Sequence, residues 1–416
     1  MSSSLVGSEM CIRDSVASAI LALQGIADVK GAGDSKISLI LEASIFEDGF
    51  SVGHIDANVL DAIGGDDYEQ LESAGTIDAQ VRLVPPEMFA FTLAYFTGSK
   101  EHNIAMRQRA IDRGLRLNEF GLIPEEKAGS LKGIEAAKYS LSAMTEQEIY
   151  SHLDLQWVPP ELREDTGEIQ SGSEHNLPQL LEIDAIQGAL HNHTVVSDGE
   201  ATLEQMADAA QAMGWSWLGI ADHSPTLKIA NGAPADRLLE QGQKIREYNQ
   251  NWQDEGVNFR LFHGVESDIL AGGKLDHPDE VLNQLDYVVA SVHAMTKWRG
   301  RDESENTEEL LKVLDHPATK VLGHPTGRIL QGREGYEVDV HRLIDAMAEH
   351  IQDGRFKSIE LNASPYRLDI DYRLCKYAKL MGVPVAISPD AHSTRGLADI
   401  QSVSYTHLTL PTMMSV

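Results

Sequence analysis

Short apolar segments alternate with helical segments throughout the second half of the 416-residue chain. Seven segments have the length and composition of strands, and they cover residues 186–190, 217–221, 260–265, 286–292, 320–323, 357–361 and 383–388. A strand followed by a helix that leads to the next strand is the pattern of parallel sheets. The alternation therefore predicts an α/β fold in which residues 185–401 form a parallel, barrel-like sheet surrounded by helices.

Histidines and carboxylates follow the carboxyl ends of these predicted strands. They are His191, His193, Asp198, His223, Glu266, His293, His324, Asp390 and His392. In β/α barrels the loops at this end converge on one pocket, so residues far apart in the sequence can meet in space. A single histidine is more often a core or surface residue than a ligand, but a set in register with successive strands predicts a joint metal site.

The spacing within two of these motifs supports the metal site. One residue separates His191 from His193 and Asp390 from His392, and alternate side chains of a strand point to the same face. Imidazole and carboxylate are ligands of zinc, manganese and iron, and this set suffices for two or three divalent ions. The remaining histidines lack this placement and are expected to be ordinary core or surface residues.

The motifs HNHTVVSDG, ADHS, FHGVESDIL, SVHAM, GHPTGRIL, LNASPYRLDI and SPDAHS resemble the polymerase-and-histidinol-phosphatase (PHP) domain, in the form that bacterial family X DNA polymerases carry at their C-terminus. The resemblance implies a distorted seven-stranded β/α barrel with two or three ions, Mn²⁺ or Zn²⁺. It implies one ion on His191, His193, Glu266 and Asp390, a second between Glu266, His293 and His324, and a third on Asp198, His223 and His392. The residues implied in catalysis are His191, His193, Glu266, Asp390 and His392.

Divalent ions held in this way favour hydrolysis of a phosphoester. They lower the pKa of a bound water toward neutrality and neutralise charge on a phosphoryl oxygen and its leaving group. His223 or His392 could instead act as an acid, but a ligating imidazole is a poor proton donor, so ligation is favoured. Lys228, Arg328 and Arg367 follow the motifs and are candidates to bind substrate phosphate, with solvated surface charge as the alternative.

The first half of the chain shows an α+β pattern across residues 16–123. Strands are predicted at residues 36–41 and 78–84, and helices from Pro86 toward Tyr95 and across residues 101–113. The segments RLVPPEMFAFTLAYFTGSKEHNIAMRQRA and RGLRLNEFGL resemble the late palm and the thumb of a family X polymerase. The fold expected for the chain is therefore a PHP barrel preceded by an α+β palm and thumb remnant.

This second resemblance implies roles for residues of the remnant. Those implied at the nucleotide or the DNA are Tyr95, Phe96, Gly98, Ser99, Asn103 and Arg107. Asp78 matches the third metal-binding aspartate of the palm, where Mg²⁺ is the expected ion. Two earlier aspartates of the family's palm have no counterpart in this sequence, so we expect no polymerase activity. Ordinary helix surface is the alternative for the arginines.

The chain ends and the region between the two halves complete the expected organisation. Residues 1–15 and 402–416 resemble translated sequencing-adapter sequence and are expected to be foreign or disordered, with the natural gene continuing in both directions. Residues 124–184 are expected to be a linker with helices, because EDTGEIQSGSEHN is polar and rich in small residues. The chain is thus expected to be an N-terminally truncated fragment.

Net charge and cysteine content limit which partners and which cellular compartment are expected for the protein. Lys and Arg number 34 against 64 Asp and Glu, a net charge of −30 that repels polyanions at long range. A DNA contact must therefore be local or metal-mediated. Two cysteines exclude a disulfide framework and favour a reducing cytoplasm, and no apolar run reaches the length of a membrane span.

Three functions are consistent with these patterns, and the oligomeric state stays open. The family resemblance favours a Mn²⁺- or Zn²⁺-dependent 3′ to 5′ exonuclease in DNA repair, acting on gapped DNA or 3′ ends, with abasic sites as a further substrate. The net charge favours a phosphatase for small monoesters of the histidinol-phosphate type. A non-catalytic, metal-stabilised scaffold that binds DNA is the third, and it predicts metal-dependent melting without hydrolysis.

Overall fold

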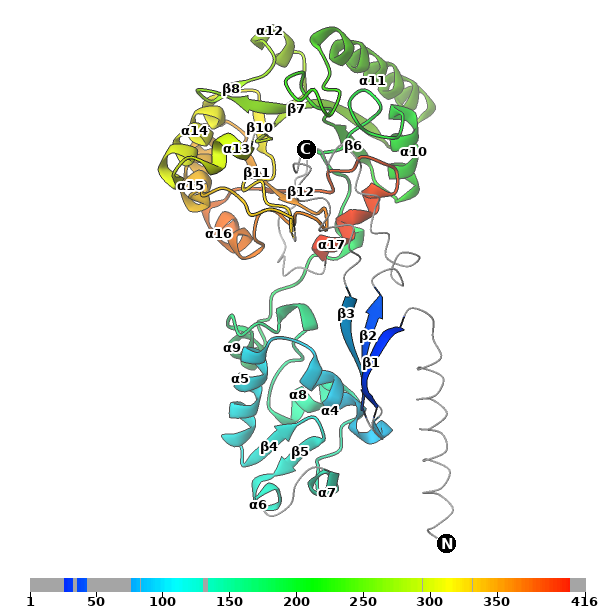
Figure 1. Ribbon diagram of the computed structural model, residues 1–416, viewed down its shortest axis with the longest axis vertical. Helices are drawn as coiled ribbons and strands as arrows, with labels where there is room; N and C mark the ends of the chain where they lie inside the picture. Colours follow the sequence, from blue (N-terminus) through cyan, green and yellow to red (C-terminus); the bar gives the residue numbers. More distant parts are fainter. Residues whose placement is uncertain are drawn as a thin grey trace. The chain divides into compact units, whose positions relative to one another are not determined.

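The computed structural model describes residues 26–32, 36–42, 76–82, 84–129, 134–293, 295–330 and 332–404. The chain divides into two compact units (Figure 1). Unit 1 comprises residues 1–54 and 71–178, and unit 2 comprises residues 55–70 and 179–416. The leader at 1–15, residues 43–75 and the last twelve residues of the expected tail, 405–416, lie outside the described residues.

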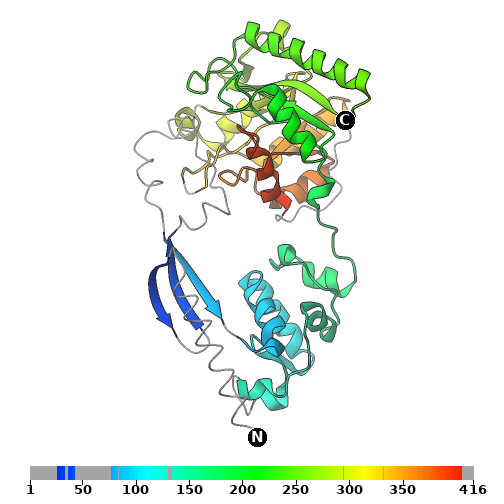
Figure 2. The ribbon, with the colours of Figure 1, turned by 90° about the vertical axis from the view of Figure 1, so that its right-hand side faces the viewer.

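Unit 1 contains a three-stranded antiparallel sheet in the order β1 (Ile26–Ala32), β2 (Lys36–Glu42) and β3 (Thr76–Arg82). Figure 2 shows the three strands running side by side. The two strands predicted in this half correspond to β2 and β3, which pair from Lys36 opposite Arg82 to Glu42 opposite Thr76. Asp78, the expected palm carboxylate, lies in β3 opposite Ile40.

Two helices and a hairpin follow the sheet. Proline suits the first turn of α4 (Pro86–Phe96), and the Ser99 hydroxyl caps α5 (Lys100–Ile111) by accepting a hydrogen bond from the His102 amide. The hairpin consists of β4 (Leu115–Asn118) and β5 (Gly121–Pro124). Short helices complete the unit: α6 (Glu125–Ala128), α7 (Ile134–Ala137), α8 (Glu146–His152), η2 (Pro160–Leu162) and α9 (Glu168–Ser173).

Residues 124–178 belong to unit 1 and do not form the expected exposed linker. Arg163 is fully buried, and its guanidinium donates to both carboxylate oxygens of Glu146 at 2.7 and 3.0 Å. Gly98, with φ of +97°, lies against Arg163, so that an added Cβ would come within 2.5 Å of the Arg163 Cβ. Glu168, within the polar stretch, is buried 2.6 Å from His102 Nδ1. Some charged residues of this polar region are buried and paired. Composition alone does not distinguish them from solvated charges.

Unit 2 is built on a curled parallel sheet whose strands follow the order β12-β11-β10-β9-β7-β6, with β8 antiparallel to β7. The strands are β6 (Trp217–Ile220), β7 (Arg260–Leu270), β8 (Lys274–Leu275), β9 (Tyr287–Ser291), β10 (Thr319–Leu322), β11 (Ser358–Asn362) and β12 (Val385–Ser388). Six of the seven predicted strands therefore exist, and the α/β class is confirmed.

Helices cover the outer face of this sheet, where they bury its apolar side chains (Figure 1). They are α10 (Leu203–Ala212), α11 (Ala235–Glu255), α14 (Glu303–Asp315), α15 (Val340–Gln352) and α16 (Arg373–Met381). The short helices α12 (Asp279–Leu282) and α13 (Met295–Arg299) lie in the connections before and after β9. The 3-10 turns η3 (Ile183–Ala185) and η4 (Gly396–Ile400) and the helix α17 (Gln401–Ser404) flank the sheet elements in sequence. No helix of the described ranges is both long and apolar enough to cross a bilayer.

The prediction of a first strand at residues 186–190 is wrong, because this segment is irregular. It still bonds to β6, since the Gly219 amide donates to the Ala189 carbonyl at 2.8 Å, and it reaches the residues after β12 through an Asn192–Ala391 bridge. The Leu190 carbonyl accepts a hydrogen bond from the buried Tyr287 hydroxyl. The segment closes the barrel without being a strand.

The boundary expected for the foreign or disordered tail, residue 402, lies within a helix of unit 2. Residues 402–404 belong to α17, and Val403 is fully buried in the core of unit 2 beside residues such as Leu397 and Ile400. A buried apolar side chain contributes roughly 1.5–3 kcal/mol to folding, so this residue is part of the domain.

Lys357 is a buried cation that precedes β11, and it predicts a pH-dependent stability. Its ammonium donates to the carbonyls of His316 and Thr319, both at 2.7 Å. Burial, with the nearby charges of Lys320 and Arg355, lowers the pKa of Lys357 to about 8. An unfolded lysine titrates near ~10.4, so above about pH 8 the unfolded chain binds more protons than the folded one. We therefore expect the free energy of unfolding to rise with pH from about 8 upward.

Urea unfolding in the presence of a chelator, repeated across this pH range, measures the effect. Lys357→Met should remove the rise, because the side chain no longer titrates in either state. Lys244→Met is the matched control, since Lys244 is exposed and paired only with Glu240. Equal slopes for the unmodified chain and Lys357→Met would contradict the assignment.

Candidate metal centre

The nine side chains expected to bind metal converge at the carboxyl ends of the strands of unit 2. Glu266 lies within β7, and the others lie in the segments that follow the strands or, for His191 and His193, in the irregular segment that closes the barrel. His324 and Asp390 adopt positive φ angles of 23° and 55°. Such conformations cost of order 1–3 kcal/mol, and they persist where the surrounding structure holds them for function.

Glu266 is the centre of the cluster and is 1% exposed. Its Oε2 lies 2.8 Å from His223 Nδ1, 3.2 Å from His191 Nε2 and 3.7 Å from His193 Nε2. Its Oε1 lies 2.9 Å from His324 Nε2 and 3.3 Å from His293 Nε2. One carboxylate therefore faces five imidazoles, an arrangement suited to a bridging ligand.

Asp198 and Asp390 anchor the other side of the cluster. The carboxylate of Asp198 lies 3.5 Å from His223 Nε2 and 3.4 Å from His392 Nε2. Asp390 Oδ1 lies 3.1 Å from His193 Nε2. The His193 and His392 rings stack with their centroids 4.1 Å apart. Together with Glu266, these residues bring all nine expected side chains into one buried site.

Among the described residues, three sets of ligand atoms are close enough to share an ion. They are His193, Asp198, His223 and His392; His191, His193 and Glu266; and His223, Glu266 and His293. This grouping differs in part from the one that the resemblance implies, since His193 lies with the Asp198 set and His223 with the Glu266 set. The imidazole rings stack on one another across the cluster, so a single ring, such as that of His193, belongs to two of these sets.

The donor atoms of this site fit divalent ions. Among the described residues, His191 Nε2, His193 Nδ1, His223 Nδ1 and Glu266 Oε2 are buried and lack a hydrogen bond of favourable geometry, although Glu266 Oε2 lies close to two of these nitrogens. A buried polar atom without a partner costs about 1–3 kcal/mol, and several in one place point to a ligand that satisfies them. Nitrogen and carboxylate oxygen at this density are the ligand types of zinc and manganese.

Electrostatics within the cluster divide the histidines into two kinds. Burial and two neighbouring imidazoles lower the pKa of His193 to about 4, so its ring is neutral at pH 7. Burial also acts on His293, but the charges of Glu266 and Asp268 outweigh it and raise the pKa of His293 to about 9. Only a neutral imidazole can bind a metal ion, so an ion would compete with a proton at a histidine whose pKa is raised, such as His293.

Three acceptors that the sequence reasoning missed orient the ligand rings. Glu360 Oε1 lies 2.8 Å from His191 Nδ1, Asp268 Oδ1 lies 2.9 Å from His293 Nδ1, and His392 Nδ1 lies 2.9 Å from the Asp390 carbonyl. Such partners fix the ring orientation and direct the other nitrogen to the ion. The signal was present in the alternation of Ser358, Glu360 and Asn362, which places one carboxylate on the inner face of β11.

Asp222 is a further missed residue, and it fixes the turn that carries Asp198. Its fully buried carboxylate accepts hydrogen bonds from the amide and hydroxyl of Thr194, from the amide and hydroxyl of Ser197 and from Gln241 Nε2. The distances range from 2.6 to 3.1 Å. Asp198 therefore approaches the cluster on a rigid support.

Glu360→Gln is expected to weaken metal binding and any metal-dependent activity by about 10–100-fold, because the charge that orients His191 is lost while the side-chain volume is kept. Metal titration followed by competition with a chromogenic chelator measures the affinity. Glu349→Gln, on the exposed face of α15, is the matched control. An unchanged affinity in Glu360→Gln would contradict the orienting role.

The candidate phosphate-binding residues differ in their surroundings. Arg367 lies beside the cluster, with its Nε 3.4 Å from Asp390 Oδ2. The Arg328 guanidinium donates to the carbonyls of Arg367 and Leu368, so it holds the loop. Lys228 is exposed. The geometry supports Arg367 as a candidate at the metal centre and gives Arg328 a structural contact instead.

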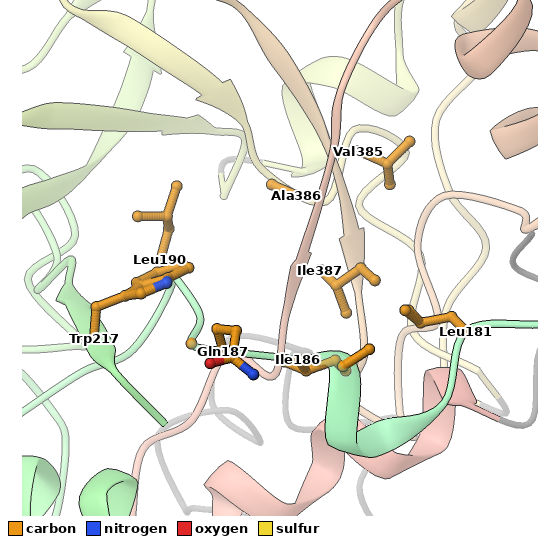
Figure 3. Close-up of a pocket in the computed structure, with 10 residues that line it drawn as sticks. Leu181, Ile186, Gln187, Leu190, Trp217, Val385, Ala386 and Ile387 are labelled. Atoms are coloured by element: carbon orange, nitrogen blue, oxygen red, sulfur yellow. The ribbon is translucent and has the colours of Figure 1, made fainter. Parts of the chain in front are cut away.

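Another concavity of unit 2 is apolar and lies at the amino ends of the strands. Its lining includes Trp217 and Val385, the first residues of β6 and β12, with Leu181, Ile186 and Leu190 (Figure 3). None of the ten lining residues carries a charge, so it lacks groups for the chemistry that the histidine cluster supports.

The residues expected at the nucleotide or the DNA lie at the end of α4, in the turn that follows it and in α5. The Asn103 side-chain amide donates to the carbonyls of Tyr95 and Ser99 at 3.2 and 3.1 Å, and Arg107 Nε donates to the Asn103 carbonyl at 3.1 Å. The Phe96 ring is about half exposed and lies 4.4 Å from the Arg82 guanidinium carbon. The turn is therefore rigid, and its binding role stays a prediction.

The other arginines of this region have local partners. Arg109 donates to the carbonyls of Leu153 and Asp154, both at 2.7 Å. Arg116 pairs with Glu125 at 2.7 Å. These contacts favour the structural reading of these arginines over the DNA-binding one.

Comparison with known proteins finds a matching family model in each of the two units. The family model for the DNA polymerase beta thumb matches residues 92–164, and the model for the PHP domain matches residues 189–364. The chain is 35% identical over 383 residues to a protein of Bacillus subtilis (strain 168) named DNA polymerase/3′-5′ exonuclease PolX, covering 92% of this chain and 58% of that relative.

Unit 2 by itself also has relatives. A protein of Caldanaerobacter subterraneus named as a probable phosphatase is 31% identical over 211 residues, covering 49% of this chain and 74% of the relative. A protein of Thermoanaerobacter sp. (strain X514) with the same description is 30% identical over 212 residues, covering 49% and 77% of the two chains. The thumb and PHP models match successive parts of one chain, and the match to the Bacillus subtilis relative covers 92% of it. Together they show that the protein belongs to the family X DNA polymerases that carry a PHP domain.

Proposed function

We propose that unit 2 is a metal-dependent phosphodiesterase that removes nucleotides from the 3′ end of DNA, with abasic sites as a further substrate. The observation that carries the proposal is the buried Glu266 carboxylate facing five imidazoles within 3.7 Å. The name of the Bacillus subtilis relative, which includes a 3′-5′ exonuclease, supports the polarity. This chain spans 58% of that relative, so activity and substrate are proposals here.

The geometry of the cluster supports the proposed ligand set. We assign ion binding to His191, His193, Asp198, His223, Glu266, His293, His324, Asp390 and His392. Bound manganese or zinc would lower the pKa of a water toward neutrality and neutralise charge on the phosphoryl oxygens. Glu266 would join two ion positions, because its two oxygens face different histidines.

Residues around the ligands would orient the substrate. The Arg367 guanidinium, beside Asp390, is suited to hold a non-bridging phosphoryl oxygen. His392 is the most exposed imidazole of the cluster, at 23%, and marks the side from which a phosphate would enter. His191, His193 and Glu266 are almost fully buried.

Unit 1 would contribute DNA binding through its thumb. We place the proposed contact with a nucleic-acid backbone at the end of α4 and in the turn that follows it, where Tyr95, Gly98 and Ser99 lie. Asp78 is proposed as a palm carboxylate with Mg²⁺ as its ion. Gapped DNA and DNA 3′ ends are the proposed partners.

The test uses the metal-loaded chain with 5′-labelled, 3′-recessed DNA and, in parallel, with histidinol phosphate. Stepwise shortening of the labelled strand from its 3′ end, in the presence of Mn²⁺ or Zn²⁺, is the expected result. Release of phosphate from the monoester alone would overturn the nuclease proposal.

A monoesterase of the histidinol-phosphatase type is the second candidate. Two observations favour it: the net charge of −30, which repels long polyanions, and the relatives of unit 2 named as probable phosphatases. The parallel substrates in the same experiment separate the two candidates.

A further inference from the structure

His324 is a proposed ligand whose ring has no acceptor to orient it. One ring nitrogen of each of three other ligands, His191, His293 and His392, lies within 2.9 Å of an acceptor oxygen. His324 Nδ1 is buried and makes no hydrogen bond of favourable geometry with the described residues. Its Nε2 nevertheless lies 2.9 Å from Glu266 Oε1. The orientation of this ring therefore depends on the backbone that carries it.

Two buried carboxylates hold the backbone turn that begins at His324. The His324 amide donates to Glu360 Oε2 at 2.7 Å, and the Gly327 amide donates to the His324 carbonyl at 2.9 Å. Asp369 Oδ2 accepts from the Thr326 amide at 3.0 Å, from the Thr326 hydroxyl at 2.9 Å and from the Gly327 amide at 2.9 Å. His324 has a φ of 23°, a sparsely populated conformation that persists only where neighbouring groups hold it.

Asp369 reaches this turn from the neighbouring strand. β10 and β11 pair in parallel, and the amide of Asn362, the last residue of β11, donates to the Asp369 carbonyl. The Asp369 side chain is fully buried, and its Oδ1 has no hydrogen bond of favourable geometry among the described residues. A buried charge is tolerated where hydrogen bonds compensate it. The three bonds to Oδ2 therefore couple the position of this carboxylate to that of the turn.

The contact between the two loops is charged and runs in both directions. Burial raises the pKa of Asp369 to about 6, while the bonds from Thr326 and the charges of Arg328 and Arg367 act in the opposite direction. The carboxylate is therefore ionised at pH 7, and hydrogen bonds to an ionised acceptor are about twice as strong as neutral ones. In return, Arg328 donates to the carbonyls of Arg367 and Leu368.

We propose that Asp369 is a positioning residue of the metal centre, which acts through Thr326 and Gly327 to fix the turn that directs His324 Nε2 toward Glu266. The proposal rests on the metal-dependent function proposed above. It adds a residue that lies outside the nine proposed ligands and the acceptors of their rings. A clamp that only stabilises the loop would change the melting temperature and leave the metal affinity as it is.

The experiment measures metal binding by the full chain, with Zn²⁺ as the probe and a chromogenic chelator as competitor. Asp369→Asn keeps the size of the side chain and removes its charge. It is expected to lower the affinity for one bound Zn²⁺ ion about tenfold, the lower end of the range for residues that support metal ligands. The visible absorption spectrum of the Co²⁺-loaded chain, which reports the geometry of the ligands, should change as well.

Asp371→Asn is the matched control. It removes the same charge two residues further along the loop, where the Asp371 carboxylate accepts from Arg373 Nε at 2.8 Å and has no printed bond to the turn at His324. Zn²⁺ affinity and the Co²⁺ spectrum should equal those of the unmodified chain.

A second pair of variants tests the same contact from the other side. Thr326→Val keeps the branched shape of the side chain but removes the hydroxyl that donates to Asp369, and Thr326→Ser retains a hydroxyl. Thr326→Val is expected to lower the Zn²⁺ affinity about fivefold, which corresponds to one hydrogen bond. Thr326→Ser should restore the affinity of the unmodified chain.

An unchanged Zn²⁺ affinity and an unchanged Co²⁺ spectrum in folded Asp369→Asn would overturn the positioning role, even where the melting temperature of the metal-free chain falls. If Asp369→Asn does not fold, equal affinities of Thr326→Val and Thr326→Ser would overturn it.

Failure of the proposed function gives a different result. If the unmodified chain binds Zn²⁺ but hydrolyses neither DNA nor a monoester, the phosphodiesterase proposal fails, and the affinities of the variants still decide the role of Asp369. A chain that binds no Zn²⁺ would overturn both the metal centre and this inference.

Discussion

Glu266→Gln is expected to lower phosphodiester hydrolysis by about 10³-fold or more while the fold of unit 2 is retained. The substitution keeps the shape of the side chain but removes the charge that five imidazoles face at 2.8–3.7 Å. A bridging carboxylate holds ions whose stabilisation of the transition state amounts to several kcal/mol, and its loss removes that stabilisation. Single-turnover hydrolysis of labelled DNA at saturating Mn²⁺ measures the loss.

The matched control is Glu280→Gln, an exposed carboxylate in α12. Circular dichroism should show the same secondary structure for both variants. Full activity in Glu266→Gln would exclude the central role of this carboxylate. Loss of activity in Glu280→Gln as well would indicate a general charge effect instead.

Removal of metal is expected to lower the melting temperature of unit 2 by about 10 °C. An ion present at ~1,000 times its dissociation constant stabilises the folded state by about 4 kcal/mol. For a domain of about 200 residues, each kcal/mol corresponds to about 2–4 °C. The physical source is the set of buried nitrogen and oxygen atoms around Glu266 that lack a hydrogen bond of favourable geometry among the described residues.

Scanning calorimetry with metal and with excess chelator measures this shift. Because the chain has two compact units, a transition of unit 1 that does not move serves as an internal control. Glu266→Gln should reduce the shift of unit 2. A full metal-dependent shift without hydrolysis of either DNA or a monoester would favour the scaffold, and no shift would contradict the metal site.

Local patterns in the sequence were sufficient for the α/β class, for six strands of the barrel and for the convergence of nine side chains. Strand alternation and the position of His223, His293 and His324 after apolar segments are properties of a few consecutive residues. In a parallel sheet such residues share one edge whatever the order of the strands. Their role as metal ligands stays a prediction that the experiments above test.

Only the tertiary structure decided the order of the strands and the long-range contacts between side chains. Glu360 faces His191 across 169 positions of sequence, and Arg163 pairs with Glu146 inside a segment whose composition suggested a solvated linker. The irregular segment is bonded at Leu190 to the hydroxyl of Tyr287, 97 positions away. The sequence by itself determined the type of each element and the kind of residue at its end, because these are local. The partners of those residues were decided by long-range packing, because burial and strand order arise only when the whole domain has folded.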